Sequence, residues 1–105
     1  MELIQQAAAA RFGVSVELQC ERAKVEPAHV LATRDAAMLA AHRMCPQPSP
    51  RAVGRAFGGR NHAVVARAIR RALAREKKSA PYREMVRQLT AAGMPWLPVE
   101  LRDAQ

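Results

Sequence analysis

A pair of adjacent glycines, Gly58 and Gly59, is the feature that most constrains how this chain can fold. Glycine adopts left-handed backbone conformations without a steric penalty, so such a pair ends a helix and turns the chain sharply. Upstream, Ser49 can cap a helix whose first residue is Pro50, where the missing N–H costs nothing. Downstream, Asn61 can cap a second helix. The sequence therefore predicts two helices joined by a tight glycine turn.

The segment after Asn61 has two contrasting faces. Its apolar residues recur at the 3.6-residue spacing of a helix, and we expect them to face the core: Val64, Val65, Ala68, Ile69, Ala72 and Leu73. The opposite face is polar and basic, and it comprises His62, Arg67, Arg70, Arg71, Arg75, Lys77 and Lys78. Two helices joined by a short glycine turn, the second of them basic, are typical of a DNA-binding helix-turn-helix.

Positive charge is concentrated in the same part of the chain. The formal net charge is +8 at pH 7. Between Arg51 and Lys78 there are nine arginine and lysine residues and one acidic residue, Glu76, so this segment alone accounts for the net charge. Such a localised field favours a polyanionic partner, either duplex DNA or structured RNA, although a basic helix face can also serve solubility alone.

Composition indicates a small helical protein. A chain of 105 residues can build one domain with a single core. Alanine is abundant and aromatic residues are few, which favours an all-α fold. No apolar run reaches the ~18 residues that a membrane span requires, and no secretory leader is expected. The two cysteines do not form a disulfide framework, so we expect a reduced, cytoplasmic chain.

The glycine turn carries a resemblance to a known family. The run AFGGRNHAVV resembles AFGGRDHTTV, the signature of the C-terminal DNA-binding domain of DnaA, the bacterial replication initiator. Three upstream segments are also similar to the family, and they occur in the family's order. RFGVSVELQ resembles the end of the first helix with the short helix after it, and ATRDAAMLAAHRM resembles the long helix. PRAVGRAF resembles the segment before the turn. The resemblance covers about residues 3–78.

The resemblance implies a small all-α domain built around a helix-turn-helix, similar to that of the Trp repressor, over residues 1–78. Within it, residues 2–12 are expected to form the first helix, and Ser15 is expected to cap a short helix after it. Residues 79–105 are expected to add a further helix that ends at Gly93 and then an apolar tail.

The resemblance also assigns the residues that read bases. In the family the DHTT run contacts base edges in the major groove, and the corresponding positions here are Asn61, His62, Ala63 and Val64. Asparagine can pair with adenine, whereas the two threonine hydroxyls are replaced by methyl surface. We therefore do not expect the family's usual site to be read with full specificity. Two of these residues have simpler interpretations, because Val64 could belong to the core and His62 could be a surface histidine.

Phosphate contacts are predicted for arginines around the turn and along the second helix: Arg51, Arg55, Arg60, Arg67, Arg70 and Arg71, with Arg75 adding a more diffuse field. Arg34 matches the arginine of an Arg-Gln pair near the start of the family's long helix. Here Asp35 replaces the glutamine, and it is expected to cap that helix or to pair with Arg34. The helix itself is predicted over Thr33 to Met44, with Thr33 as its N-cap.

Residues 19–32 are expected to be irregular, because Pro27 interrupts a helix. The family has a strongly basic loop here, whose arginine enters the minor groove. In this sequence two glutamates offset Arg22 and Lys24, so we expect the minor-groove contact to be lacking. Arg22 and Lys24 are either candidates for phosphate contacts or part of an ordinary solvated loop.

The tail after Gly93 is more apolar than is usual for a chain terminus without a binding or packing role. Met94, Trp96 and Leu97 are candidates for docking a partner, and the alternative is that the tail folds back over the core.

The sequence therefore favours non-catalytic binding of double-stranded DNA by a regulator of replication initiation or transcription. The alternative is a protein-interaction module that binds the replication initiator or another regulator, with base reading largely lost. No enzyme, cofactor or metal site is expected, because the chain lacks a phosphate-binding glycine loop, a catalytic constellation and paired metal ligands. The target sequence and the oligomeric state are left open.

Overall fold

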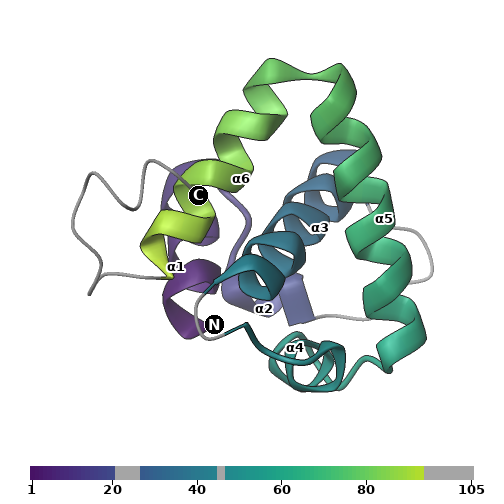
Figure 1. The fold of residues 1–105 in the computed structure, drawn as a ribbon. Coiled ribbons are helices and arrows are strands. Elements are labelled where there is room, and N and C mark those ends of the chain that lie inside the picture. Colours follow the sequence, from purple (N-terminus) through teal and green to yellow (C-terminus); the bar gives the residue numbers. More distant parts are fainter. Residues whose placement is uncertain (21–26, 45–46, 94–105) are drawn as a thin grey trace.

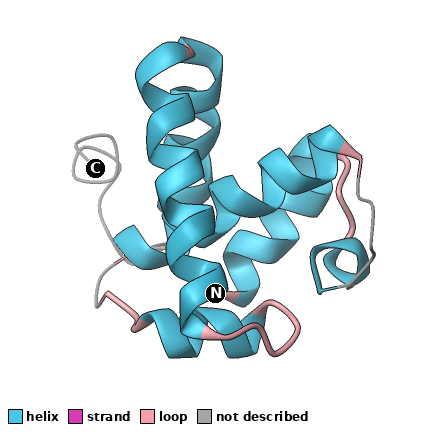
Figure 2. Ribbon diagram, turned by 90° about the vertical axis from the view of Figure 1, so that its right-hand side faces the viewer, coloured by secondary structure: helices cyan, strands magenta, loops and turns pink. Residues whose placement is uncertain are grey.

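A computed structural model describes residues 1–20, 27–44 and 47–93 (Figure 1). These ranges contain six helices: α1 (Glu2–Phe12), α2 (Val16–Cys20), α3 (Ala28–Arg43), α4 (Pro50–Ala56), α5 (His62–Lys78) and α6 (Ala80–Ala92). Short described loops join α1 to α2, α4 to α5 and α5 to α6, and the described ranges contain no strand (Figure 2). None of the described helices is long and apolar enough to cross a membrane. The all-α prediction is confirmed.

Helix α3 lies at the centre of the fold, where it packs against α1, α4, α5 and α6 (Figure 1). Every residue from Ala36 to Ala41 is buried, and its four alanines let the neighbouring helices approach closely. Larger side chains fill the remaining space, with Phe57 and Leu89 fully buried among them. Helix α6 belongs to the same core, because its residues Tyr82, Val86 and Leu89 are buried in it. The hydroxyl of Tyr82 also donates to the carbonyl of Ala32 at 2.7 Å.

The predicted caps of the two helices around the turn are confirmed. The Ser49 hydroxyl accepts a hydrogen bond from the amide of Ala52 at 3.2 Å, and Asn61 Oδ1 accepts one from the amide of Val64 at 3.0 Å. Between these helices, Gly58 and Gly59 have φ angles of 89° and 74°, both in the left-handed region. The chain turns here because only glycine takes two such conformations in succession without strain.

Two glycines also hold the turn against its neighbours. The amide of Arg60 donates to the Gly54 carbonyl at 2.9 Å, and a Cβ atom on Gly54 would overlap the carbonyl oxygen of Arg60. A Cβ atom on Gly58 would overlap the carbonyl oxygen of Cys20, at the end of α2. The geometry of the α4–α5 corner therefore depends on close backbone approach at both positions.

The predicted start of the central helix is wrong. Helix α3 begins at Ala28 rather than at Thr33, and the residue before its first turn is Pro27. Proline is well tolerated at a helix start because it has no N–H to leave unbonded, and the carbonyl of Pro27 accepts hydrogen bonds from the amides of Val30 and Leu31. Thr33 consequently lies inside the helix, where it is buried.

One smaller expectation is also corrected. Leu73, predicted to face the core, is 37% exposed, whereas Val65, Ala68 and Ala72 are buried as predicted. Helix α5 ends at Lys78, and Pro81 lies in the first turn of α6, which the Ser79 hydroxyl caps by accepting from the amide of Tyr82.

Candidate nucleic-acid interface

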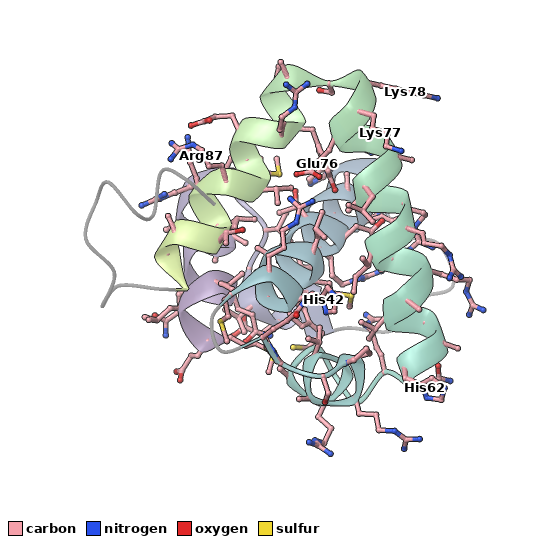
Figure 3. All side chains as sticks on the ribbon, in the orientation of Figure 1. His42, His62, Glu76, Lys77, Lys78 and Arg87 are labelled. Atoms are coloured by element: carbon pink, nitrogen blue, oxygen red, sulfur yellow. The ribbon has the colours of Figure 1, made fainter. Side chains whose placement is uncertain are left out.

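The α4–α5 corner brings basic side chains together at the start of α5. A shallow depression of about 210 Å³ is lined there by Arg51, Arg55, Arg60, Asn61 and His62. These residues come from α4, the glycine turn and the first turn of α5, and Figure 3 shows His62 at the end of α5 that adjoins α4. The glycine turn therefore places three arginines around the N-terminus of α5.

The helix adds its own field to these charges. The aligned peptide dipoles of α5, a 17-residue helix, place partial positive charge at its N-terminus. Anionic groups are stabilised at such a position, and more strongly where cationic side chains lie beside it. The corner is therefore an electropositive surface, on which anionic groups are favoured.

The residues predicted to read bases lie on this surface to different degrees. Asn61, His62 and Ala63 are exposed, whereas Val64 is half-buried. Because Oδ1 of Asn61 caps α5, its amide nitrogen is left to donate a hydrogen bond outward. Pairing with both N6 and N7 of adenine requires an acceptor as well as a donor, so Asn61 Oδ1 would have to accept a second hydrogen bond in addition to the one from Val64.

The predicted phosphate contacts separate into three groups. Four arginines are exposed and have no hydrogen-bond or ion-pair partner within the described ranges: Arg51, Arg55, Arg67 and Arg70. Arg60 is half-buried, and its Nε donates to the carbonyl of Phe57 at 2.9 Å, which holds its side chain against the turn. Arg71 belongs to a third group, because an acidic residue already binds it.

Arg71 joins α5 to α3 through Asp35. Its Nε and Nη2 donate to the two carboxylate oxygens of Asp35 at 2.9 and 3.0 Å. The prediction that Asp35 caps α3 is wrong, because Asp35 lies well inside that helix with a side chain only 5% exposed. Burial raises the pKa of Asp35, and the hydrogen bond from Arg71 opposes that rise. The charge of Arg71 thus compensates a buried carboxylate.

The remaining predicted residues lie elsewhere. Arg34 is 4% exposed, so it presents almost no surface to a ligand. The loop candidates Arg22 and Lys24 and the tail candidates Met94, Trp96 and Leu97 lie outside the residues that the structure describes.

Replacing Arg71 with alanine is expected to lower the free energy of unfolding by about 2 kcal/mol at pH 7.5, because it leaves Asp35 ionised and buried without its ion-pair partner. In this variant the folded-state pKa of Asp35 rises further above its ordinary value of 3.8. The loss is therefore full where Asp35 is ionised in both folded proteins, and it shrinks as the pH falls through their folded-state pKa values, because a protonated Asp35 no longer requires a counter-charge. Urea unfolding at pH 7.5 and pH 4 measures this difference.

Arg70 provides the matched control for that prediction. It is exposed, it neighbours Arg71 in the sequence, and its replacement by alanine is expected to change the free energy of unfolding by at most about 0.5 kcal/mol at either pH. Equal losses in the two variants, or a loss in the Arg71 variant that does not depend on pH, would mean that the Arg71–Asp35 pair does not stabilise the fold.

Comparison with known proteins agrees with this arrangement. The family model described as the bacterial dnaA protein helix-turn-helix matches residues 1–72, which include α1 to α4 and most of α5. Neither a curated protein nor a solved structure matches the chain. Because the family model covers more than half of the sequence and contains the glycine turn, the chain belongs to the family of bacterial DnaA helix-turn-helix domains.

Proposed function

We propose that this chain binds double-stranded DNA with the first turn of α5 in the major groove, as a non-catalytic regulator of replication initiation or transcription. Its family indicates DNA binding. The observation that supports the geometry is the exposed start of α5 with three arginines around it. An α-helix with its side chains is about 10–12 Å across, which matches a major groove about 12 Å wide.

In this arrangement the arginines fix the position of the domain on the duplex, and the first turn of α5 reads bases. Arg51, Arg55 and Arg60 bind phosphates beside the groove, and Arg67 and Arg70 bind further along α5. Phosphate contacts fix register and orientation but carry no sequence information. Specificity therefore depends on His62 and the amide of Asn61, with Ala63 contacting a thymine methyl group.

Selection of bound duplexes from a random pool tests this proposal. We expect an enriched motif with the unmodified chain and loss of that enrichment with His62→Ala, because removing one base contact costs about 1–3 kcal/mol of discrimination. His62 is exposed, so the variant is expected to keep its fold.

Two other results would contradict parts of the proposal. Binding without any enriched motif would mean that the chain contacts only the phosphate backbone. Absence of duplex binding would remove the function altogether and would favour the alternative hypothesis, a module that binds the replication initiator or another regulator protein.

A further inference from the structure

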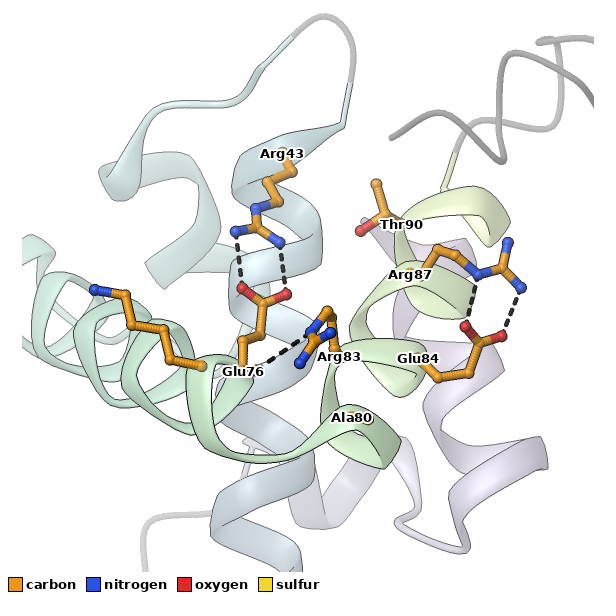
Figure 4. Close-up of a pocket in the computed structure, with 8 residues that line it drawn as sticks. Arg43, Glu76, Ala80, Arg83, Glu84, Arg87 and Thr90 are labelled. Carbon is orange, nitrogen blue, oxygen red and sulfur yellow. Dashed lines mark hydrogen bonds and ion pairs between the residues drawn. The ribbon is translucent and has the colours of Figure 1, made fainter.

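A second, larger depression lies at the other end of α5, between the C-terminal parts of α3 and α5 and one face of α6 (Figure 4). Its volume is about 550 Å³. Charged side chains dominate its lining: Arg43, Glu76, Lys77, Arg83, Glu84 and Arg87. We call this feature the α5–α6 depression.

Both carboxylates in the α5–α6 depression are already bound by arginines. Arg43 donates through Nη1 and Nη2 to the two oxygens of Glu76 at 2.7 and 2.9 Å. Arg87 donates through Nε and Nη2 to the two oxygens of Glu84 at 2.8 and 2.6 Å. Hydrogen bonds from Arg87 and Gln88 hold the pKa of Glu84 at about 2, so this carboxylate is ionised at neutral pH. Each acid is therefore balanced by one base.

Among the described residues, two cations in the depression have no carboxylate partner. Lys77 is exposed and makes no hydrogen bond or ion pair with a described residue. Arg83 is also exposed, and its Nε donates to the main-chain carbonyl of Glu76 at 3.4 Å. Figure 4 shows Arg83 between the two Arg–Glu pairs. The depression thus carries unbalanced positive charge from Lys77 and Arg83.

The lining determines which class of anion fits. Sites for cofactors and other small molecules are lined mainly by hydrophobic and aromatic residues, whereas six of the eight residues that line this depression are charged. A DNA duplex is too wide to enter a hollow of this volume, whereas a single extended peptide segment is narrow enough to lie in it. Arginine clusters that recognise acidic peptide motifs offer the same chemistry as this lining.

We propose that the α5–α6 depression binds an acidic segment of a partner protein, with carboxylates of that segment on Lys77 and Arg83. The depression and the proposed DNA surface lie at opposite ends of α5, because Lys77 is about 22 Å along the helix from His62. An acidic segment can therefore bind while DNA occupies the α4–α5 corner. This inference goes beyond the proposed function and does not depend on it.

The probe for this proposal is a fluorescein-labelled peptide of six Glu-Ser repeats, with a Gln-Ser peptide of the same length as its neutral control. Anisotropy gives the affinity of the full chain, and amide NMR shifts give the location, each measured without DNA and with saturating duplex. We expect shifts around Lys77 and Arg83 that persist in the presence of the duplex. The double variant Lys77→Ala with Arg83→Ala is expected to weaken peptide binding about tenfold.

Lys78→Ala is a control for nearby charge, because it removes one neighbouring exposed cation that does not line the depression. It is expected to change peptide affinity by less than about twofold. Shifts confined to the α4–α5 corner, unchanged affinity in the double variant, or equal binding of the neutral peptide would each overturn the proposal. Duplex binding is measured separately, so failure of the DNA proposal is distinguishable from failure of this one.

Discussion

Alanine at position 54 is expected to lower the free energy of unfolding by about 3 kcal/mol, since its Cβ atom would overlap the carbonyl oxygen of Arg60 and force the α4–α5 corner open. Helix propensity alone predicts the opposite sign, because alanine is about 1 kcal/mol more favourable than glycine inside a helix. Urea unfolding of Gly54→Ala therefore distinguishes two cases: a glycine that is required by a close backbone contact, and a glycine that alanine can replace. Unchanged or increased stability would contradict the packing described for this corner.

Gly13→Ala is the control for that measurement. Unlike Gly54, which lies inside α4, Gly13 has a positive φ angle of 71°, and a Cβ atom there would have no heavy atom within 4 Å. Gly13→Ala therefore introduces the strain of a left-handed alanine without a clash, and this strain is expected to cost about 1 kcal/mol. We expect Gly54→Ala also to weaken DNA binding at temperatures where the variant is still folded, because the corner sets the position of Arg60 and the start of α5. Gly13→Ala is not expected to do so.

Removing Arg51 and Arg55 together is expected to weaken duplex binding about 30-fold at low salt, if each exposed contact contributes about 1 kcal/mol. Five exposed or half-buried arginines, Arg51, Arg55, Arg60, Arg67 and Arg70, predict a log–log salt slope of about −4 to −5 for the unmodified chain. The double variant loses two of these contacts, so its slope is expected to be shallower by about 2. Binding measured between 50 and 200 mM salt gives both quantities.

The control pair for this experiment lies at the other end of α5. Lys77→Ala with Lys78→Ala removes the same charge from exposed positions, and it is expected to change the salt slope by less than about 1. A similar loss in both double variants would mean that net charge, rather than the α4–α5 corner, drives binding. A slope near zero for the unmodified chain would rule out phosphate contacts as the source of affinity.

The α4–α5 corner could be predicted because it depends on interactions between residues that are close in the sequence. The caps by Ser49 and Asn61 and the left-handed conformations of Gly58 and Gly59 were confirmed. The exposure of the basic face of α5 was predictable for the same reason, since helical periodicity places it opposite Val65 and Ala68. The family resemblance then added roles for particular positions, and those roles remain predictions.

The features that the sequence did not predict depend on contacts between segments that are distant in the sequence. Nothing beside Asp35 in the sequence indicates that Arg71, on another helix, binds it, nor that Arg34 is buried. The importance of Gly54 likewise depends on the Arg60 carbonyl, although a glycine inside a short helix was a signal that could have been noticed. The α5–α6 depression is assembled from three helices, so composition revealed its charges but not their pairing.

The central claim is that the start of α5 and the arginines of the α4–α5 corner face duplex DNA. NMR titration of the full chain with a 20-base-pair duplex tests it most directly. We expect the largest amide shifts between Arg51 and Ala63, with little change around Arg83 and Arg87. Shifts that spare the α4–α5 corner, or that spread evenly over the basic residues of the domain, would contradict the account.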